Sequence, residues 1–168
     1  MATIVEDAQV DGADTPAADG GKVWPVVSFL ARFIMAGVWI VAGGLKYGKD
    51  MENILSVQAY QLVPDQVAFA IGTWLPTLEI ALGVLLLIGL FLRPAGVISA
   101  LLQVVFIIGI VSAWARGLQI DCGCFGSGGV DTTVTGVDYA VEIVRDVFFL
   151  ILSGITVIRP WKKLAFFP

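Results

Sequence analysis

Four long apolar stretches dominate the chain, and its polar residues are gathered between them. Each stretch reaches the length of about 20 residues that a helix needs to cross a bilayer. The stretches cover residues 26–45, 67–91, 95–115 and 138–158. This pattern predicts an all-α integral membrane protein, a four-helix bundle in which the second and third helices are joined at residues 92–94.

Composition supports a membrane protein and excludes several function classes. Hydrophobic residues make up 58% of the 168 residues and charged residues only 14%, against about 25% charged residues in a typical soluble domain. The net charge of −4 offers no basic patch for phosphates, which argues against nucleic-acid binding. The chain has no histidine, so the commonest metal ligand and general base are absent and we expect no metal.

Both ends of the chain are polar, with opposite charge. Residues 1–21 contain five acidic residues and neither Lys nor Arg. Such a segment buries too little apolar surface to fold, so residues 1–25 are predicted to be a disordered acidic cytoplasmic tail. Residues 159–168 are predicted to be a basic cytoplasmic tail. A single transmembrane domain, residues 26–158, lies between the two tails.

Basic residues near the helix ends indicate the orientation, because cytoplasmic flanks are enriched in Lys and Arg. Five of them lie on one side of the predicted membrane and three on the other. The first group is Lys22, Arg93, Arg159, Lys162 and Lys163, and the second is Lys46, Lys49 and Arg116. This excess places both termini in the cytoplasm and the loops 46–66 and 116–137 outside.

The most distinctive segment is a glycine-rich loop that contains both cysteines of the chain, Cys122 and Cys124. Gly123 between them gives the backbone the freedom to close a small disulfide ring. Strained, exposed disulfides are more oxidising than structural ones, which predicts a thiol–disulfide exchange site. Arg116 and Asp121 lie close in sequence, and we expect Arg116 to lower the thiol pKa values and Asp121 to raise them.

The cysteines allow three other interpretations. A disulfide that only staples the glycine-rich loop is the main alternative. A zinc site is less favoured, because two thiolates without histidine fall short of the four ligands that zinc prefers. Acylated cysteines at the membrane interface would lie on the cytoplasmic side, opposite to the predicted position of the loop.

Charged residues inside the predicted spans include Arg32, Glu79, Glu142, Arg145 and Asp146. A charge inside a bilayer is costly unless it is paired or faces a cavity, so each is a candidate functional residue. Glu142 shares a helix face with Arg145 and Asp146 through its i, i+3 and i+4 spacing. With Glu79, these residues predict a proton path or polar ligand pocket below the cysteine loop. For Glu79 and Arg32, a structural ion pair between helices, such as Glu79 with Arg145 or with Arg32, is the favoured interpretation.

Several motifs resemble those of DoxX-like membrane proteins. They are Arg32 in the first helix, Gly44-Leu-Lys46, Tyr60-Gln-Leu-Val-Pro64 and Leu75-Pro76-x-x-Glu79-x-x-x-Gly83. The loop Ala115-Arg-Gly-x-x-x-Asp-Cys-Gly-Cys-Phe-Gly126, followed by Arg145-Asp146, is similar to the MauE branch of that group. The resemblance covers residues 26–158, and the cysteine loop is its most specific part.

The resemblance implies a redox-associated protein of the bacterial cytoplasmic membrane. Such a protein would exchange electrons with an extracytoplasmic thioredoxin-like partner through Cys122 and Cys124. Comparable disulfide-generating membrane enzymes have two cysteine pairs, whereas this chain has one. Electrons would therefore pass directly to a quinone or to another subunit.

Two functions of other classes remain open. In the first, the chain is a non-catalytic accessory subunit of a larger respiratory or redox complex in the membrane. In the second it is a transporter whose pathway uses Glu79 or Arg145, an option weakened by the absence of an evident inverted repeat. A function that survives loss of the cysteines would distinguish both of these proteins from an exchange protein.

Overall fold

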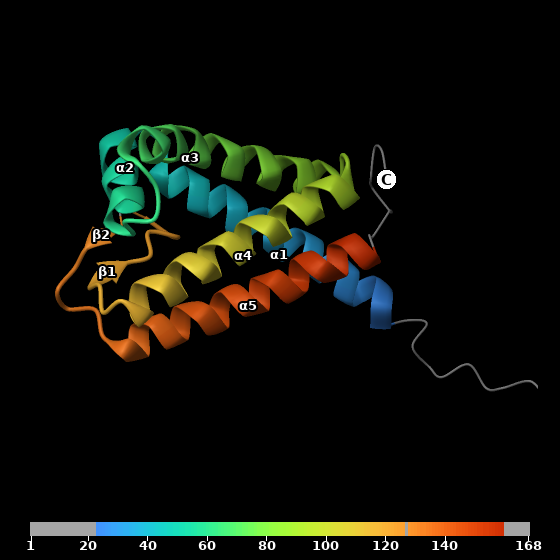
Figure 1. Ribbon diagram of the computed structural model, residues 1–168. Coiled ribbons are helices and arrows are strands. Elements are labelled where there is room, and N and C mark those ends of the chain that lie inside the picture. Colours follow the sequence, from blue (N-terminus) through green and yellow to red (C-terminus); the bar gives the residue numbers. More distant parts are fainter. Residues whose placement is uncertain (1–22, 127, 160–168) are drawn as a thin grey trace, which may run out of the picture.

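The computed structural model describes residues 23–126 and 128–159, and within them the chain is mostly helical (Figure 1). The long helices are α1 (Val23–Lys46), α3 (Asp65–Ile88), α4 (Leu92–Ala115) and α5 (Gly136–Ile158). A short helix, α2 (Asp50–Ala59), and two strands, β1 (Ile120–Asp121) and β2 (Gly129–Val130), complete the described part. The two predicted tails fall almost wholly outside the described residues.

The four long helices pack in pairs. α1 lies mainly along α3, α4 lies along α5, and α1 also contacts α5. The start of α1 and the end of α5 lie at one end of the molecule, whereas α2 and the strands lie at the other (Figure 1). The cysteine loop therefore sits opposite the two ends of the described chain.

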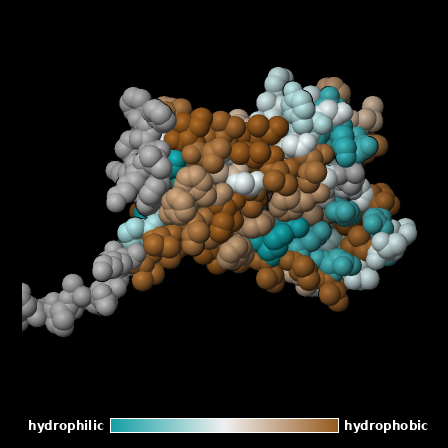
Figure 2. Space-filling view, turned by 180° about the vertical axis from the view of Figure 1, so that it is seen from behind, coloured by the Kyte–Doolittle hydropathy of each residue, from teal (hydrophilic) through white to brown (hydrophobic). Residues whose placement is uncertain are grey.

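Three of these helices, α1, α3 and α4, are long and apolar enough to cross a membrane. Apolar side chains cover the flanks of the long helices, and hydrophilic residues gather mainly at the end with α2 and the strands (Figure 2). These features indicate a multi-pass membrane protein. Helix α5 was predicted as a fourth span but does not meet the same criterion, because it carries Asp138, Glu142, Arg145 and Asp146.

The turn between α3 and α4 lies earlier than the sequence predicted. Helix α3 ends at Ile88 and is capped by Gly89, whose φ of 80° is the left-handed conformation that glycine adopts readily. The N–H groups of Gly89 and Leu90 both donate to the carbonyl of Leu85. Helix α4 starts at Leu92, so Pro94 lies in its first turn, where the missing N–H of proline costs no hydrogen bond.

Helix α2 and the β1–β2 pair were not predicted, and together they position the cysteine loop. Helix α2 buries Ile54 against α3 at Gly72, where an added Cβ would come within 2.7 Å of the Ile54 backbone. The strands pair antiparallel, with Ile120 opposite Val130 and Asp121 opposite Gly129. The segment between these strands contains both cysteines.

Candidate functional site

The two cysteines differ in exposure. Cys122 is half-buried, whereas Cys124 is buried with 7% of its surface exposed, and both are free thiols. The backbone N–H of Cys124 donates to Cys122 Sγ at 3.3 Å. The loop therefore curls around the sulfur of Cys122, the thiol that an outside molecule can reach.

Glycine and Asp121 fix the conformation of this loop. Asp121 Oδ1 accepts a hydrogen bond from the N–H of Gly123 at 3.0 Å, and Gly123 has a φ of +65°. Gly128 packs against Gly123 so closely that a Cβ on Gly128 would lie 2.4 Å from the Gly123 Cα. Asp121 therefore shapes the loop that holds Cys122.

Residues from α2 and the segment that follows it hold the loop in place. The Tyr60 hydroxyl donates to the carbonyl of Cys122 at 2.9 Å, and the Ser56 hydroxyl donates to the carbonyl of Gly128 at 2.6 Å. Burial raises the pKa of the Tyr60 phenol, so it stays a protonated donor. Arg116 was expected beside the thiols, but its guanidinium instead donates to the carbonyl of Tyr60.

Arg145 is the cation that faces the thiols. Its Nη2 lies 3.6 Å from Cys122 Sγ, and its Nε donates to Asp146 Oδ1 at 3.1 Å. The guanidinium also lies over the ring of Phe125, 5.0 Å from the centroid. A cation fixed at this distance stabilises a thiolate by Coulomb attraction.

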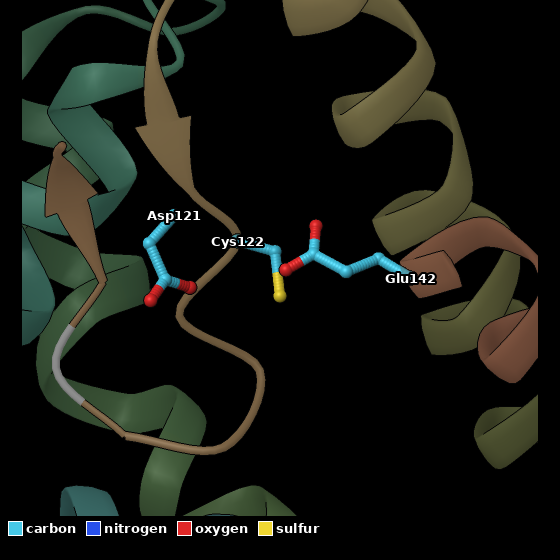
Figure 3. Close-up of side chains that lie close together, drawn as sticks. All are labelled: Asp121, Cys122 and Glu142. Carbon is cyan, nitrogen blue, oxygen red and sulfur yellow. The ribbon is translucent and has the colours of Figure 1, made fainter. Parts of the chain in front are cut away.

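Glu142 reaches from α5 toward Cys122, with Asp121 on the other side of that cysteine (Figure 3). The carboxylate oxygens and the sulfur of these three residues lie within 4.8 Å of one another. Such a donor set is a possible metal site by distance, but the guanidinium of Arg145 beside the sulfur opposes a divalent cation. The arrangement instead suits transfer of the Cys122 proton to Glu142.

The buried thiol of Cys124 has the opposite electrostatic setting. The pKa of Cys124 is raised well above its usual value because its thiol donates a hydrogen bond to Cys122 and because it is buried; the negative charge of Asp146 adds to this effect. Cys124 therefore keeps its proton over the neutral pH range. The site pairs a reachable sulfur beside a cation with a protonated thiol behind it.

The predicted partners of Glu79 were wrong. Glu79 pairs with Lys46, whose Nζ lies 2.7 Å from Glu79 Oε1, and both side chains are buried. Arg32 instead donates to the carbonyls of Leu86 and Leu87 at the end of α3. Lys46 was counted as a loop residue, but it lies in the last turn of α1, where side chains point back along the helix.

A cavity of about 60 Å³ adjoins the cysteine loop, and its wall includes Lys46, Cys122 and Cys124. Leu75 and Phe106, which also line it, form part of an apolar groove of about 720 Å³ between α3 and α4. The thiols therefore lie close to a groove on the apolar flank of the protein.

Tyr139 ties the start of the cysteine loop to α5, and its loss should loosen that loop. The buried hydroxyl accepts a hydrogen bond from the N–H of Ile120 at 3.0 Å and donates to the carbonyl of Leu118 at 2.6 Å. Tyr139→Phe should destabilise the protein by about 1–3 kcal/mol, because it leaves a buried N–H unpaired. Thermal unfolding in detergent measures this loss, and an unchanged midpoint would contradict the anchoring role.

Comparisons with known proteins identify relatives of this chain. The family model described as methylamine utilisation protein MauE matches residues 24–159. The methylamine utilization protein MauE of Paracoccus denitrificans is 31% identical over 107 residues, which is 63% of this chain and 58% of that protein. The matched region thus spans less than two thirds of that relative. No solved structure matches.

Proposed function

Because the chain belongs to the MauE family, we propose that it serves a methylamine utilisation system as a membrane thiol–disulfide exchange protein. Its partner is an extracytoplasmic thioredoxin-like protein. The observation that carries this proposal is the guanidinium of Arg145 at 3.6 Å from the half-buried sulfur of Cys122, with the second thiol buried two residues away.

The placement in the membrane is part of the proposal. Helix α5 forms the fourth span, with Glu142, Arg145 and Asp146 turned toward the cysteine loop and the interior rather than toward lipid. Glu142 and Arg145 are each within reach of Cys122, and Asp146 is buried, which supports this orientation of α5. Both termini lie in the cytoplasm of a bacterial cell, and the cysteine loop lies outside the cytoplasmic membrane.

The exchange begins at Cys122. Glu142 takes the Cys122 proton, Arg145 stabilises the resulting thiolate, and the thiolate attacks one sulfur of the partner disulfide. Cys124 then attacks Cys122 Sγ, which forms the Cys122–Cys124 disulfide and releases the partner as a dithiolate, which takes up two protons from water. The same steps in reverse oxidise the partner.

In that reverse direction a quinone restores the disulfide. The chain has only one cysteine pair, so electrons pass directly from Cys122 and Cys124 to the acceptor. A quinone takes up two electrons and two protons and is soluble in the bilayer. The apolar groove between α3 and α4, which shares Leu75 and Phe106 with the cavity beside the thiols, supports this route.

Thiol trapping in cells tests the exchange. Acid quenching followed by alkylation should show both oxidised and reduced Cys122–Cys124 pairs. The Cys124→Ser variant should accumulate a mixed disulfide with its partner, because nothing resolves the bond at Cys122. The Cys122→Ser variant is the matched control and should trap much less, because only the buried Cys124 remains. A pair that stays oxidised and traps nothing would make the disulfide a structural staple.

A second candidate function is that of a non-catalytic accessory subunit in a larger redox complex. One surface supports it. Exposed apolar side chains recur along α5 at alternating spacings of four and three residues, the pattern of a helix-packing seam. They are Val137, Val141, Val144, Phe148 and Ile151. Copurification of a larger membrane complex by the Cys122→Ser/Cys124→Ser double variant, with full function, would favour this candidate.

A further inference from the structure

A small internal cavity lies behind Cys124, where all four long helices meet. Its volume is about 10 Å³, and Cys124 forms part of its wall. Its polar lining also includes Glu79 from α3, Gln103 from α4 and Asp146 from α5. A space of this size accommodates one water molecule when several polar groups surround it.

Three oxygen atoms of this lining have no hydrogen-bond donor among the described residues. They are Glu79 Oε2, Gln103 Oε1 and Asp146 Oδ2. The three residues are 0%, 3% and 2% exposed. Buried polar atoms are paired in nearly all proteins, so three unpaired acceptors around one cavity indicate a bound proton or water.

Three neighbouring donors are engaged elsewhere. Lys46 Nζ donates to the other oxygen of Glu79, at 2.7 Å, and Arg145 Nε donates to the other oxygen of Asp146, at 3.1 Å. The indole N–H of Trp39, which also lines the cavity, donates to the Ser99 hydroxyl at 2.7 Å. The fixed positive charges thus hold one oxygen of each carboxylate and leave the other for a proton.

We propose that this cavity is an internal proton-holding site, in which one water joins Glu79, Gln103 and Asp146, and that Asp146 accepts the thiol proton of Cys124. This inference rests on the proposed exchange function and adds a second proton acceptor to it. Gln103 was not among the residues that the sequence singled out.

The site accounts for the second of the two protons that the exchange reaction releases. Oxidation of the two thiols to a disulfide releases two protons, and the two electrons go to the partner disulfide. The proton of Cys122 goes to Glu142, which reaches that sulfur from α5. The proton of Cys124 goes to Asp146 as the Cys124 sulfur attacks Cys122 and the partner thiolate leaves. Reduction of the pair returns both protons.

Charged groups from several elements surround Asp146. They are Lys46 from α1, Glu79 from α3, and Glu142 and Arg145 from α5; the two titratable but uncharged thiols of the loop lie beside them. Lys46 and Arg145 balance two of the three carboxylates in charge. A thiolate at Cys124 would add uncompensated negative charge, so the thiol needs a proton acceptor at the moment of attack.

Dithionitrobenzoate, an aromatic disulfide whose released thiolate is coloured, separates the two steps in the full-length reduced protein. Attack by Cys122 releases the first coloured thiolate, and attack by Cys124 on the resulting mixed disulfide releases the second. The variant Asp146→Asn should slow the second release by about 100-fold at neutral pH, the lower end of a general-base contribution. The first release should change by less than about twofold, because Glu142 and Arg145 are retained.

The pH profile distinguishes proton transfer from a structural effect. The deficit of Asp146→Asn should shrink as pH rises, because solvent hydroxide then removes the Cys124 proton without Asp146. Ser153→Ala is the matched control: Ser153 Oγ is also buried without a hydrogen-bond partner among the described residues, but it does not line this cavity. Its two releases should match those of the native protein. An Asp146→Asn profile equal to the native one would overturn the inference.

Infrared spectroscopy of the native protein tests the same inference without relying on a folded variant. Oxidation of the cysteine pair should produce the carbonyl band of a protonated carboxylic acid that does not exchange with bulk solvent. Absence of that band would overturn the proton-holding site. If the native protein releases only one coloured thiolate, the exchange function itself fails. Two releases without the band leave the exchange intact and remove only this site.

Discussion

Lys46→Met should strongly destabilise the protein, because it leaves the carboxylate of Glu79 in the interior without its cation. The ion pair joins α1 to α3 at 2.7 Å, and its side chains are only 5% and 0% exposed. Removing one partner of a buried pair typically costs about 3–5 kcal/mol. That is a large part of the total stability of about 5–15 kcal/mol that proteins of ordinary size have.

Size-exclusion chromatography in detergent after heating measures the folded fraction. Lys49→Met is the matched control, because Lys49 forms an exposed pair with Glu52 at 4.0 Å and such pairs contribute only about 0–1 kcal/mol. The double variant Lys46→Met/Glu79→Gln should recover much of the loss, since no buried charge is left unpaired. A Lys46→Met protein as stable as the Lys49→Met control would contradict the importance of this pair.

Gly43→Ala should separate α1 from α3, whereas the same change at the next residue should be harmless. A Cβ on Gly43 would lie 2.6 Å from the Pro76 carbonyl oxygen and 3.0 Å from the Cβ of Glu79. Because the nearest atom belongs to the backbone, the helices themselves would have to move apart. We expect a loss of about 3 kcal/mol, the upper end of ordinary overpacking, and displacement of Glu79 from Lys46.

Gly44→Ala supplies the control within the same turn of α1. No atom lies within 4 Å of a Cβ built on Gly44. Because alanine favours a helix over glycine by about 1 kcal/mol, this variant should be neutral or slightly more stable. Thermal unfolding midpoints in one detergent compare the two. Equal midpoints would mean that α1 and α3 are not in close contact at Gly43.

Hydropathy was sufficient to locate the long helices, because each of them is predominantly apolar over about 20 residues. Hydropathy does not predict the short helix and the strand pair at one end of the molecule, because they are not continuously apolar. Helix α2 and the β1–β2 pair are short and partly polar, and they are held by contacts such as that between Ile54 and Gly72 rather than by a periodic pattern. The turn before α4 was placed too late because Arg93 and Pro94 look like loop residues, although proline suits a first helical turn.

The sequence predicted the main residues of the site, but not which side chains contact one another within it. The spacing of Cys122 and Cys124, and of Glu142 with Arg145 on one helix face, is visible along the sequence. Which cation faces the sulfur depends on how α5 lies against the loop, and the structure has Arg145 there while Arg116 binds Tyr60. Lys46 lies far from Glu79 in the sequence, and only the packing of α1 against α3 brings them together. In the same way, only the packing of several helices places Gln103 at the cavity behind Cys124.

Apolar side chains lie on the outside of this protein, so the positions that tolerate substitution should differ from those of a water-soluble protein. Large exposed residues such as Leu101, Ile108 and Val111 lie on the outside of α4. Exchanges among apolar residues at these positions should accumulate freely. Purifying selection should fall instead on small and polar residues that face inward, such as Gly43 and Ser99. A variant-effect survey of this chain would therefore rank inward-facing glycines and serines above outward-facing leucines, the opposite of the order expected in a water-soluble enzyme.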